Sequence, residues 1–151
     1  MDKGEIAKQY FLKGYNCAQS VVLAFKDEVK MNEETLKALS LSFGGGISRL
    51  RNVCGCISGM GIIFGLLYGH FDVLDYKKKG EHYALIQKLS KKFEKEMGSM
   101  KCSFLLNIKD EPSNPYLCHR NQDYYQNRPC GKYIAYMANL MQEEMNKHGK
   151  D

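Results

Sequence analysis

The 151-residue chain lacks the features that mark several classes of protein. Residues 1–6 hold no apolar segment and no small-residue cleavage site, so we predict no secretory signal and expect a cytoplasmic location. Neither Cys-x-x-Cys nor Cys-x-x-Cys-His occurs, which excludes a thioredoxin-like dithiol, the common zinc-ribbon spacing and covalent haem attachment. Alternating apolar runs typical of strands are scarce, and neither a domain linker nor a long repeat is visible.

The sequence also lacks a long run of residues of one charge sign. The net charge is only +5, and glutamates such as Glu81 and Glu94 interrupt the lysines of residues 77–95. This pattern predicts a solvated helix face and no nucleic-acid partner. Residues 52–71 carry no formal charge but are rich in glycine, which weakens a helix and lowers its hydrophobicity. We therefore expect a buried helix there and no membrane span.

Helix signals dominate what remains. Residues that commonly cap helices, such as Asp2, Asn16 and Asn32, precede segments whose apolar residues recur at helical spacing. Residues 109–128, with Pro112 and Pro115, break this pattern and predict a long loop. The expected fold is an all-α, single-domain bundle over residues 1–151 with six to seven helices and a proline-containing loop before the last one. Besides a helix that starts after Asn32, the predicted helices span residues 3–13, 17–29, 53–68, 76–97, 101–107 and 129–147.

Against these absences stand six cysteines. A chain of this length buries about 70% of its unfolded surface and needs no disulfide to hold a core. In a reducing compartment, cysteines indicate metal binding or redox chemistry. A helix N-terminus presents unpaired N–H groups and a partial positive charge, which favour thiolate over thiol. We expect one redox or metal site formed by the cysteines that begin predicted helices, which are Cys17, Cys54, Cys102 and Cys130.

The remaining two cysteines are placed differently. Cys56 forms a Cys-Gly-Cys unit with Cys54, and residues two apart on a helix point to different faces. Joint ligation by this pair therefore requires Cys54 to lie before the regular helix. Cys118 lies beside His119 in the predicted loop. Cys56, Cys118 and His119 are either additional metal ligands or incidental side chains.

Several motifs together carry a family resemblance. They are GYNCAQS at 14–20, FGGGI at 43–47 and CGCISG at 54–59, followed by Cys102 and Cys130. With these motifs the chain resembles the C-GCAxxG-C-C family of redox-active bacterial and archaeal proteins. The resemblance implies that the family cysteines are Cys17, Cys54, Cys102 and Cys130. The chain departs from the pattern at Cys56, where the family usually has alanine, and at Cys118. It is also similar to the non-haem part of split-Soret cytochromes, which implies an iron–sulfur centre without the haems.

Three functions stand as hypotheses. The first is electron transfer through an iron–sulfur cluster, most simply [2Fe–2S], held by the four helix-start cysteines, with the backbone of Gly55 and Gly59 near the inorganic sulfides. The second is metal-free thiol–disulfide exchange by the same cysteines, with Cys54 as the attacking thiolate. The third is a structural Cys₄ zinc site in an interaction module. The first two require a redox partner protein, and the aromatic pair in the loop, Tyr124 and Tyr125, favours a homodimer.

Overall fold

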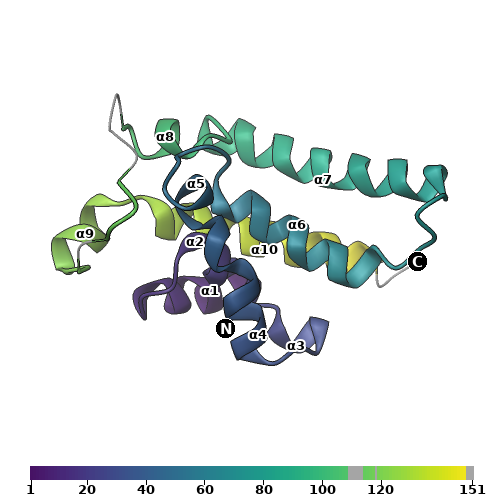
Figure 1. Ribbon diagram of the computed structural model, residues 1–151, viewed down its shortest axis with the longest axis horizontal. Coiled ribbons are helices and arrows are strands. Elements are labelled where there is room, and N and C mark those ends of the chain that lie inside the picture. Colours follow the sequence, from purple (N-terminus) through teal and green to yellow (C-terminus); the bar gives the residue numbers. More distant parts are fainter. Residues whose placement is uncertain (109–113, 118, 149–151) are drawn as a thin grey trace.

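The computed structural model describes residues 1–108, 114–117 and 119–148, and these form an all-α bundle (Figure 1). Within these ranges no strand occurs, and the pairing between Val53 and Lys101 is an isolated antiparallel bridge. The expected fold class is thereby confirmed. None of the helices in the same ranges is both long and apolar enough to cross a bilayer.

Three long helices form the frame of the bundle. They are α6 (Gly55–Tyr68), α7 (Tyr76–Met97) and α10 (Cys130–His148). Figure 1 shows α7 along one edge, with α6 and α10 beneath it, and the three helices contact one another. Their apolar faces bury large side chains between them, including Phe64, Phe93 and Met137, none of which is exposed. Burial of such side chains is the main contribution to the stability of a fold of this kind.

The N-terminal helices pack against the opposite side of this frame. They are α1 (Lys3–Leu12), α2 (Cys17–Leu23) and α4 (Glu33–Ser40). Asn16 begins α2 with a capping box: its side chain accepts from the Gln19 N–H at 2.9 Å, and the Gln19 side chain accepts from the Asn16 N–H at 3.0 Å. Because α2 contacts α1, α4, α6 and α10, the position of its first residue is fixed by several neighbouring helices.

Two boundaries predicted from the sequence are wrong. The helix expected over residues 17–29 breaks after Leu23, and α3 (Lys26–Val29) follows as a separate turn. Phe25, at the break, has non-helical dihedral angles and no exposed surface, so packing of its ring in the core overrides helix propensity. The second error is α9 (Gln122–Asn127), which lies inside the predicted loop. Asn121 caps it by accepting from the Tyr124 N–H at 2.9 Å, a signal hidden among the amides and prolines of that segment.

A glycine-rich connection joins the two halves of the chain. After α4 come a 3₁₀ turn, η1 (Leu41–Phe43), and then α5 (Gly44–Ile47), which is not a right-handed helix because Gly45 and Gly46 have φ of 69° and 65°. We call residues 44–53 the glycine loop. It continues in the left-handed region at residues that carry side chains, each of which costs about 1–2 kcal/mol in that conformation. These residues are Ile47, Ser48, Arg49 and Arg51.

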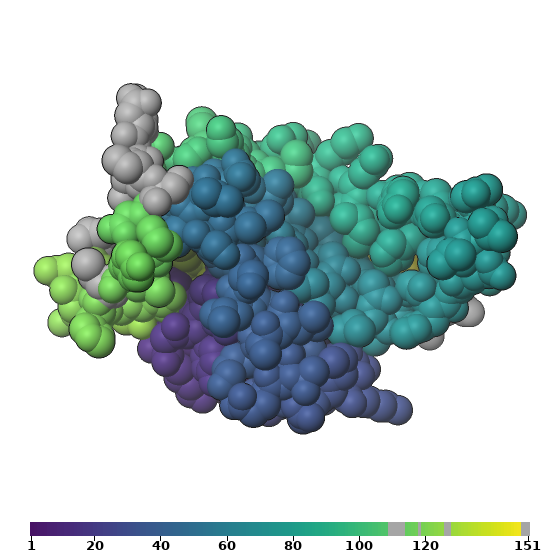
Figure 2. Space-filling model, viewed as in Figure 1, coloured from purple at the N-terminus to yellow at the C-terminus, as the bar shows by residue number. Residues whose placement is uncertain are grey.

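The glycine loop lies beside α8 (Cys102–Leu105) at one end of the frame. Figure 2 shows α9 and residues 114–117 at this same end of the surface, next to the N-terminal helix α1. The other end holds the C-terminus of α6, the start of α7 and the last turn of α10 (Figure 1). The two ends of the long helices are thus built from different kinds of element.

Candidate redox site

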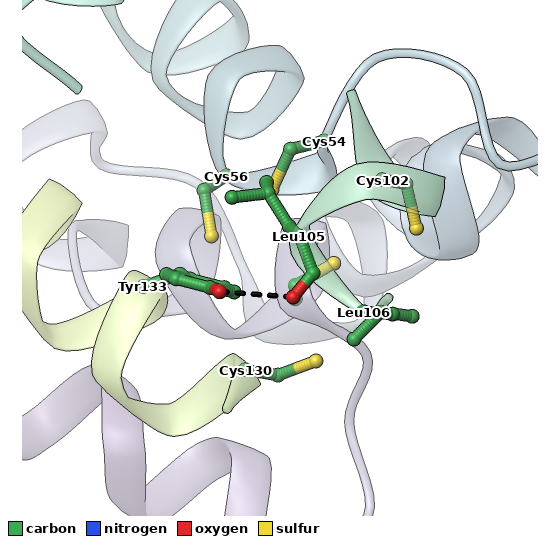
Figure 3. Close-up of a pocket in the computed structure, with 8 residues that line it drawn as sticks. Cys54, Cys56, Cys102, Leu105, Leu106, Cys130 and Tyr133 are labelled. Atoms are coloured by element: carbon green, nitrogen blue, oxygen red, sulfur yellow. Dashed lines mark hydrogen bonds between the residues drawn. The ribbon is translucent and has the colours of Figure 1, made fainter. Parts of the chain in front are cut away.

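The end of the bundle that carries the glycine loop contains a small cavity into which cysteines from four helices project (Figure 3). Its volume of about 20 Å³ is room for about one water molecule. The side chains around it are sulfur-bearing or mainly apolar, namely Cys17, Cys54, Cys56, Cys102, Cys130, Leu105, Leu106 and Tyr133. The structure therefore brings together the four cysteines expected to meet, and it adds Cys56 as a fifth.

Each of the four expected cysteines stands at the start of a helix. Cys17 and Cys102 are the first residues of α2 and α8, and Cys130 is the first residue of α10. Cys54 is the N-cap of α6, with φ −56° and ψ 134°, so it precedes the regular helix. This is the condition under which Cys54 and Cys56 can face the same space, and both line the cavity.

Backbone hydrogen bonds hold Cys54 and Cys102 side by side. The Cys54 N–H donates to the carbonyl of Met100 at 2.8 Å, and the Cys102 N–H donates to the carbonyl of Asn52 at 2.6 Å. These two bonds flank the isolated bridge between Val53 and Lys101. Two segments far apart in the sequence therefore position two of the cysteines as one unit.

Two glycines give the sulfur atoms room. A Cβ added at Gly55 would lie 2.6 Å from Cys17 Sγ and 3.0 Å from the backbone nitrogen of Ala18. A Cβ at Gly46 would lie 2.6 Å from the Cβ of Cys102. Gly59, which we expected beside a cluster, packs instead against the Ala18 carbonyl, where an added Cβ would be 3.0 Å away. Its role in the structure is the close packing of α2 on α6.

Three of the cavity cysteines, Cys17, Cys54 and Cys56, shift one another's pKa values. The thiols of Cys54 and Cys56 donate toward Cys17, and together with backbone N–H groups of Gly45 and Gly55 they hold the pKa of Cys17 well below its ordinary value, although burial opposes this. The same contacts with Cys17, together with burial, raise the pKa of Cys54 and of Cys56. This order favours Cys17, rather than Cys54, as the thiolate of the group.

The other two cysteines of the cavity are held as thiols. Burial, followed by the charges of Cys17 and Cys102, raises the pKa of Cys130 to about 12. Burial also raises the pKa of Cys102, while the guanidinium of Arg51, with Nη1 3.7 Å from Cys102 Sγ, acts in the opposite direction. All five cavity cysteines are free thiols in this structure.

Of the two remaining predicted ligands, His119 is exposed and does not line the cavity, and Cys118 lies outside the described residues. Tyr133, which is not among the predicted site residues, donates its hydroxyl to the Leu105 carbonyl at 2.9 Å and closes one wall (Figure 3). Tyr133 follows Cys130 by three residues, and this helical spacing could have identified it as a neighbour of that cysteine.

The side chains of the cavity that could bind a metal are all thiols. Thiolates are the usual ligands of iron–sulfur clusters, so the four helix-start cysteines fit that group chemically. Over the described ranges, no three His, Cys, Asp or Glu side chains are placed to hold a single metal ion.

The comparison with known families gives the family of the chain. Residues 15–144 match the family described as "Putative redox-active protein (C_GCAxxG_C_C)". The chain belongs to this family. The match spans all four helix-start cysteines, and the description of the C_GCAxxG_C_C family indicates a redox-active protein. No curated protein and no solved structure is detectably similar to the chain. The similarity to split-Soret cytochromes therefore stays a prediction.

Proposed function

We propose that this C_GCAxxG_C_C protein transfers electrons through an iron–sulfur cluster, most simply [2Fe–2S]. The observation that carries the proposal is that cysteines at the starts of four separate helices line one cavity. A disulfide uses two sulfur atoms from two positions, whereas a cluster uses four cysteines. The residues that would hold it are Cys17, Cys54, Cys102 and Cys130.

The surroundings of the cavity suit a negatively charged group. The long helices α6 and α10 begin at Cys54 and Cys130, so their free N–H groups and positive dipole ends face the site. Leu105, which is 6% exposed, and the Tyr133 ring cover it from the side of α8 and α10. A bound cluster would supply one-electron chemistry. Leu105 and Tyr133 would keep water from its sulfur atoms, and the helix N-termini would stabilise its negative charge and raise its potential.

Iron and sulfide content after anaerobic preparation tests this proposal. We expect a coloured protein with iron and acid-labile sulfide bound per chain after reconstitution. Serine at any one of the four helix-start cysteines should abolish or strongly reduce this uptake. The matched control is Cys56→Ala, which restores the usual family residue in the same cavity and should retain the cluster. A colourless, iron-free protein after reconstitution would reject the proposal.

Thiol–disulfide exchange is a second candidate because Cys17 lines the same cavity as Cys54 and Cys56, whose thiols lower its pKa. The Cys17 thiolate would attack a disulfide of a partner protein, forming a mixed disulfide and releasing one partner thiolate. Deprotonated Cys54 would then attack the Cys17 sulfur, forming a Cys17–Cys54 disulfide and releasing the second partner thiolate. Two electrons pass to the partner, and the proton lost by Cys54 goes to solvent or to a released thiolate.

Mass spectrometry separates this candidate from the first. Metal-free protein treated with a disulfide oxidant should lose two hydrogen atoms per chain, and peptide mapping should locate the new bond at Cys17. In a Cys54→Ser variant the bond should form with Cys56 or not at all. Unchanged mass after oxidation would exclude exchange at this site.

A further inference from the structure

The glycine loop, residues 44–53, is held in an unfavourable conformation against the redox site. Gly45, Gly46, Ile47, Ser48 and Arg49 have positive φ in succession, and Arg51 follows with φ of 62°. A β-branched residue such as Ile47 rarely adopts this region. Several such residues in one segment persist only where the surrounding structure enforces them, and they gather at functional sites.

Hydrogen bonds fix the loop both to itself and to α8. The N–H groups of Arg51 and Asn52 donate back to the carbonyls of Gly45 and Gly46 at 3.1 and 2.9 Å. The carbonyl of Arg51 accepts from the Ser103 N–H at 3.3 Å. Because Ser103 follows Cys102 directly, the backbone of Arg51 is tied to the segment that carries this cysteine.

The loop also presents two arginines to different neighbours. Arg51 Nη1 lies 3.7 Å from Cys102 Sγ, whereas Arg49 Nη1 donates to the Tyr116 carbonyl at 2.6 Å. Cys102 is only 6% exposed, so the guanidinium of Arg51 meets a sulfur atom that is largely shielded from water. A cation paired with a poorly solvated sulfur has a stronger effect than the same cation in water.

We propose that Arg51 is a positioning residue of the redox site, whose N–H group, 3.7 Å from the Cys102 sulfur, holds that sulfur toward the shared cavity. The strained glycine loop fixes the guanidinium in this place. The proposal rests on the proposed function only in assigning Cys102 a redox role. The contact between Arg51 and Cys102 can be tested with or without a cluster.

The test compares Arg51→Gln, Arg51→Lys and Arg49→Gln with the unaltered protein. In metal-free, reduced protein, site-resolved alkylation by iodoacetamide at one fixed pH should be about tenfold slower at Cys102 in Arg51→Gln. In Arg51→Lys the alkylation rate at Cys102 should fall about threefold, because lysine keeps the charge but not the planar guanidinium. Arg49→Gln, which removes a charge from the same loop, should stay within about twofold of the unaltered rate.

In reconstituted protein the same variants should change the reduction potential. The positive charge of Arg51 stabilises the more negative, reduced state, so Arg51→Gln should lower the potential. A tenfold change in the equilibrium constant corresponds to about 59 mV for a one-electron couple. A chain that takes up no iron yet shows the alkylation effect would reject the cluster and keep the role of Arg51.

Contrary results are easily recognised. If Cys102 in Arg51→Gln reacts at the unaltered rate, reacts faster, or slows equally in Arg49→Gln, the proposal is wrong. Circular dichroism shows whether each variant folds. Should Arg51→Gln fail to fold, Arg51→Lys measured against Arg49→Gln decides, and equal Cys102 rates in those two would overturn the assignment.

Discussion

The two ends of helices α6 and α10 show how one bundle separates stability from chemistry. At the far end, the Tyr68 and His148 rings stack at 4.5 Å, and Lys88 pairs with Glu144 at 2.9 Å. These are contacts between regular helices. The opposite end, which we call the sulfur end, instead has the short helix α8, the left-handed glycine loop and the five cysteines that line one cavity. The run of left-handed residues and the largest pKa shifts thus gather at the sulfur end, and such features are common at reactive sites.

The largest expected effect separates two cysteines within the sulfur end. Cys17 and Cys130 are both half-buried, but the pKa of Cys17 is well below its ordinary value and that of Cys130 is raised to about 12. In metal-free, reduced protein at pH 7, iodoacetamide should alkylate Cys17 about 100-fold faster, after allowance for the weaker nucleophilicity of a stabilised thiolate.

The pH dependence gives this prediction its sign. A thiol reacts in proportion to its thiolate fraction. Because the pKa of Cys17 is lowered, its alkylation rate should reach a plateau already at low pH, whereas the rate at Cys130 still rises about tenfold per pH unit. The ratio between the two sites should therefore shrink as the pH rises. Parallel pH profiles at both cysteines, measured by peptide mass spectrometry, would contradict the contrast.

The second prediction compares two glycines on α6. Gly55 lies at the sulfur end, where an added Cβ would approach Cys17 Sγ to 2.6 Å, whereas Gly61 has no neighbouring atom within 4 Å of such a Cβ. Gly55→Ala should lower the free energy of unfolding by about 1–3 kcal/mol through overpacking and displace Cys17. Gly61→Ala should raise it by about 0.5–1 kcal/mol through helix propensity.

Denaturant unfolding and Cys17 alkylation measure both parts of this prediction. If Gly55→Ala leaves the stability and the Cys17 rate unchanged, the close approach of the α6 backbone to that sulfur is not a constraint. A Gly61→Ala variant that also disturbs Cys17 would show that α6 responds as a whole rather than at one end.

The sequence predicts the two ends unequally well. The long helices follow from apolar periodicity, and the starts of α2 and α4 follow from Asn16 and Asn32, because caps and stripes are local signals. Among the cysteines, Cys17 directly follows the Asn16 cap, and Cys130 follows Pro129, a residue typical of a first helical turn. These local signals sufficed for the fold class and for four of the cavity cysteines.

The remaining features of the sulfur end depend on tertiary contacts. Ile47, Ser48 and Arg49 carry no sequence mark of a left-handed conformation, and their φ values are imposed by hydrogen bonds within the loop. The contact of Arg51 with Cys102 joins residues 51 positions apart. Cys54 and Cys56 can both face the cavity because Cys54 is the N-cap of α6 and precedes the regular helix. A shift of this boundary by one residue would have turned the two side chains to different faces.

The smallest expected effect concerns Glu144, which lies at the far end of the bundle and, like Cys17, has a lowered pKa. Glu144 is 6% exposed. Burial alone would raise its pKa, but the hydrogen bond from Lys88 and the charges of Lys88, Lys147 and His148 hold that pKa below its ordinary value. A carboxyl with a depressed pKa in the folded state stabilises the fold above its unfolded pKa of about 4.3. This contribution is lost as the pH falls through the folded value.

Glu144→Gln should therefore lower the free energy of unfolding at pH 7 by only about 0.5–1 kcal/mol, because the Lys88 side chain is 46% exposed and solvent screens the pair. The deficit should vanish as the pH falls below about 4. Urea titrations at several pH values measure it, with Glu143→Gln, a change at the exposed neighbour, as the control. Cys17 alkylation should be unaltered in both variants. A change at Cys17 would mean that the charges of the two ends are coupled along α10, and that stability and chemistry are not separated in this bundle.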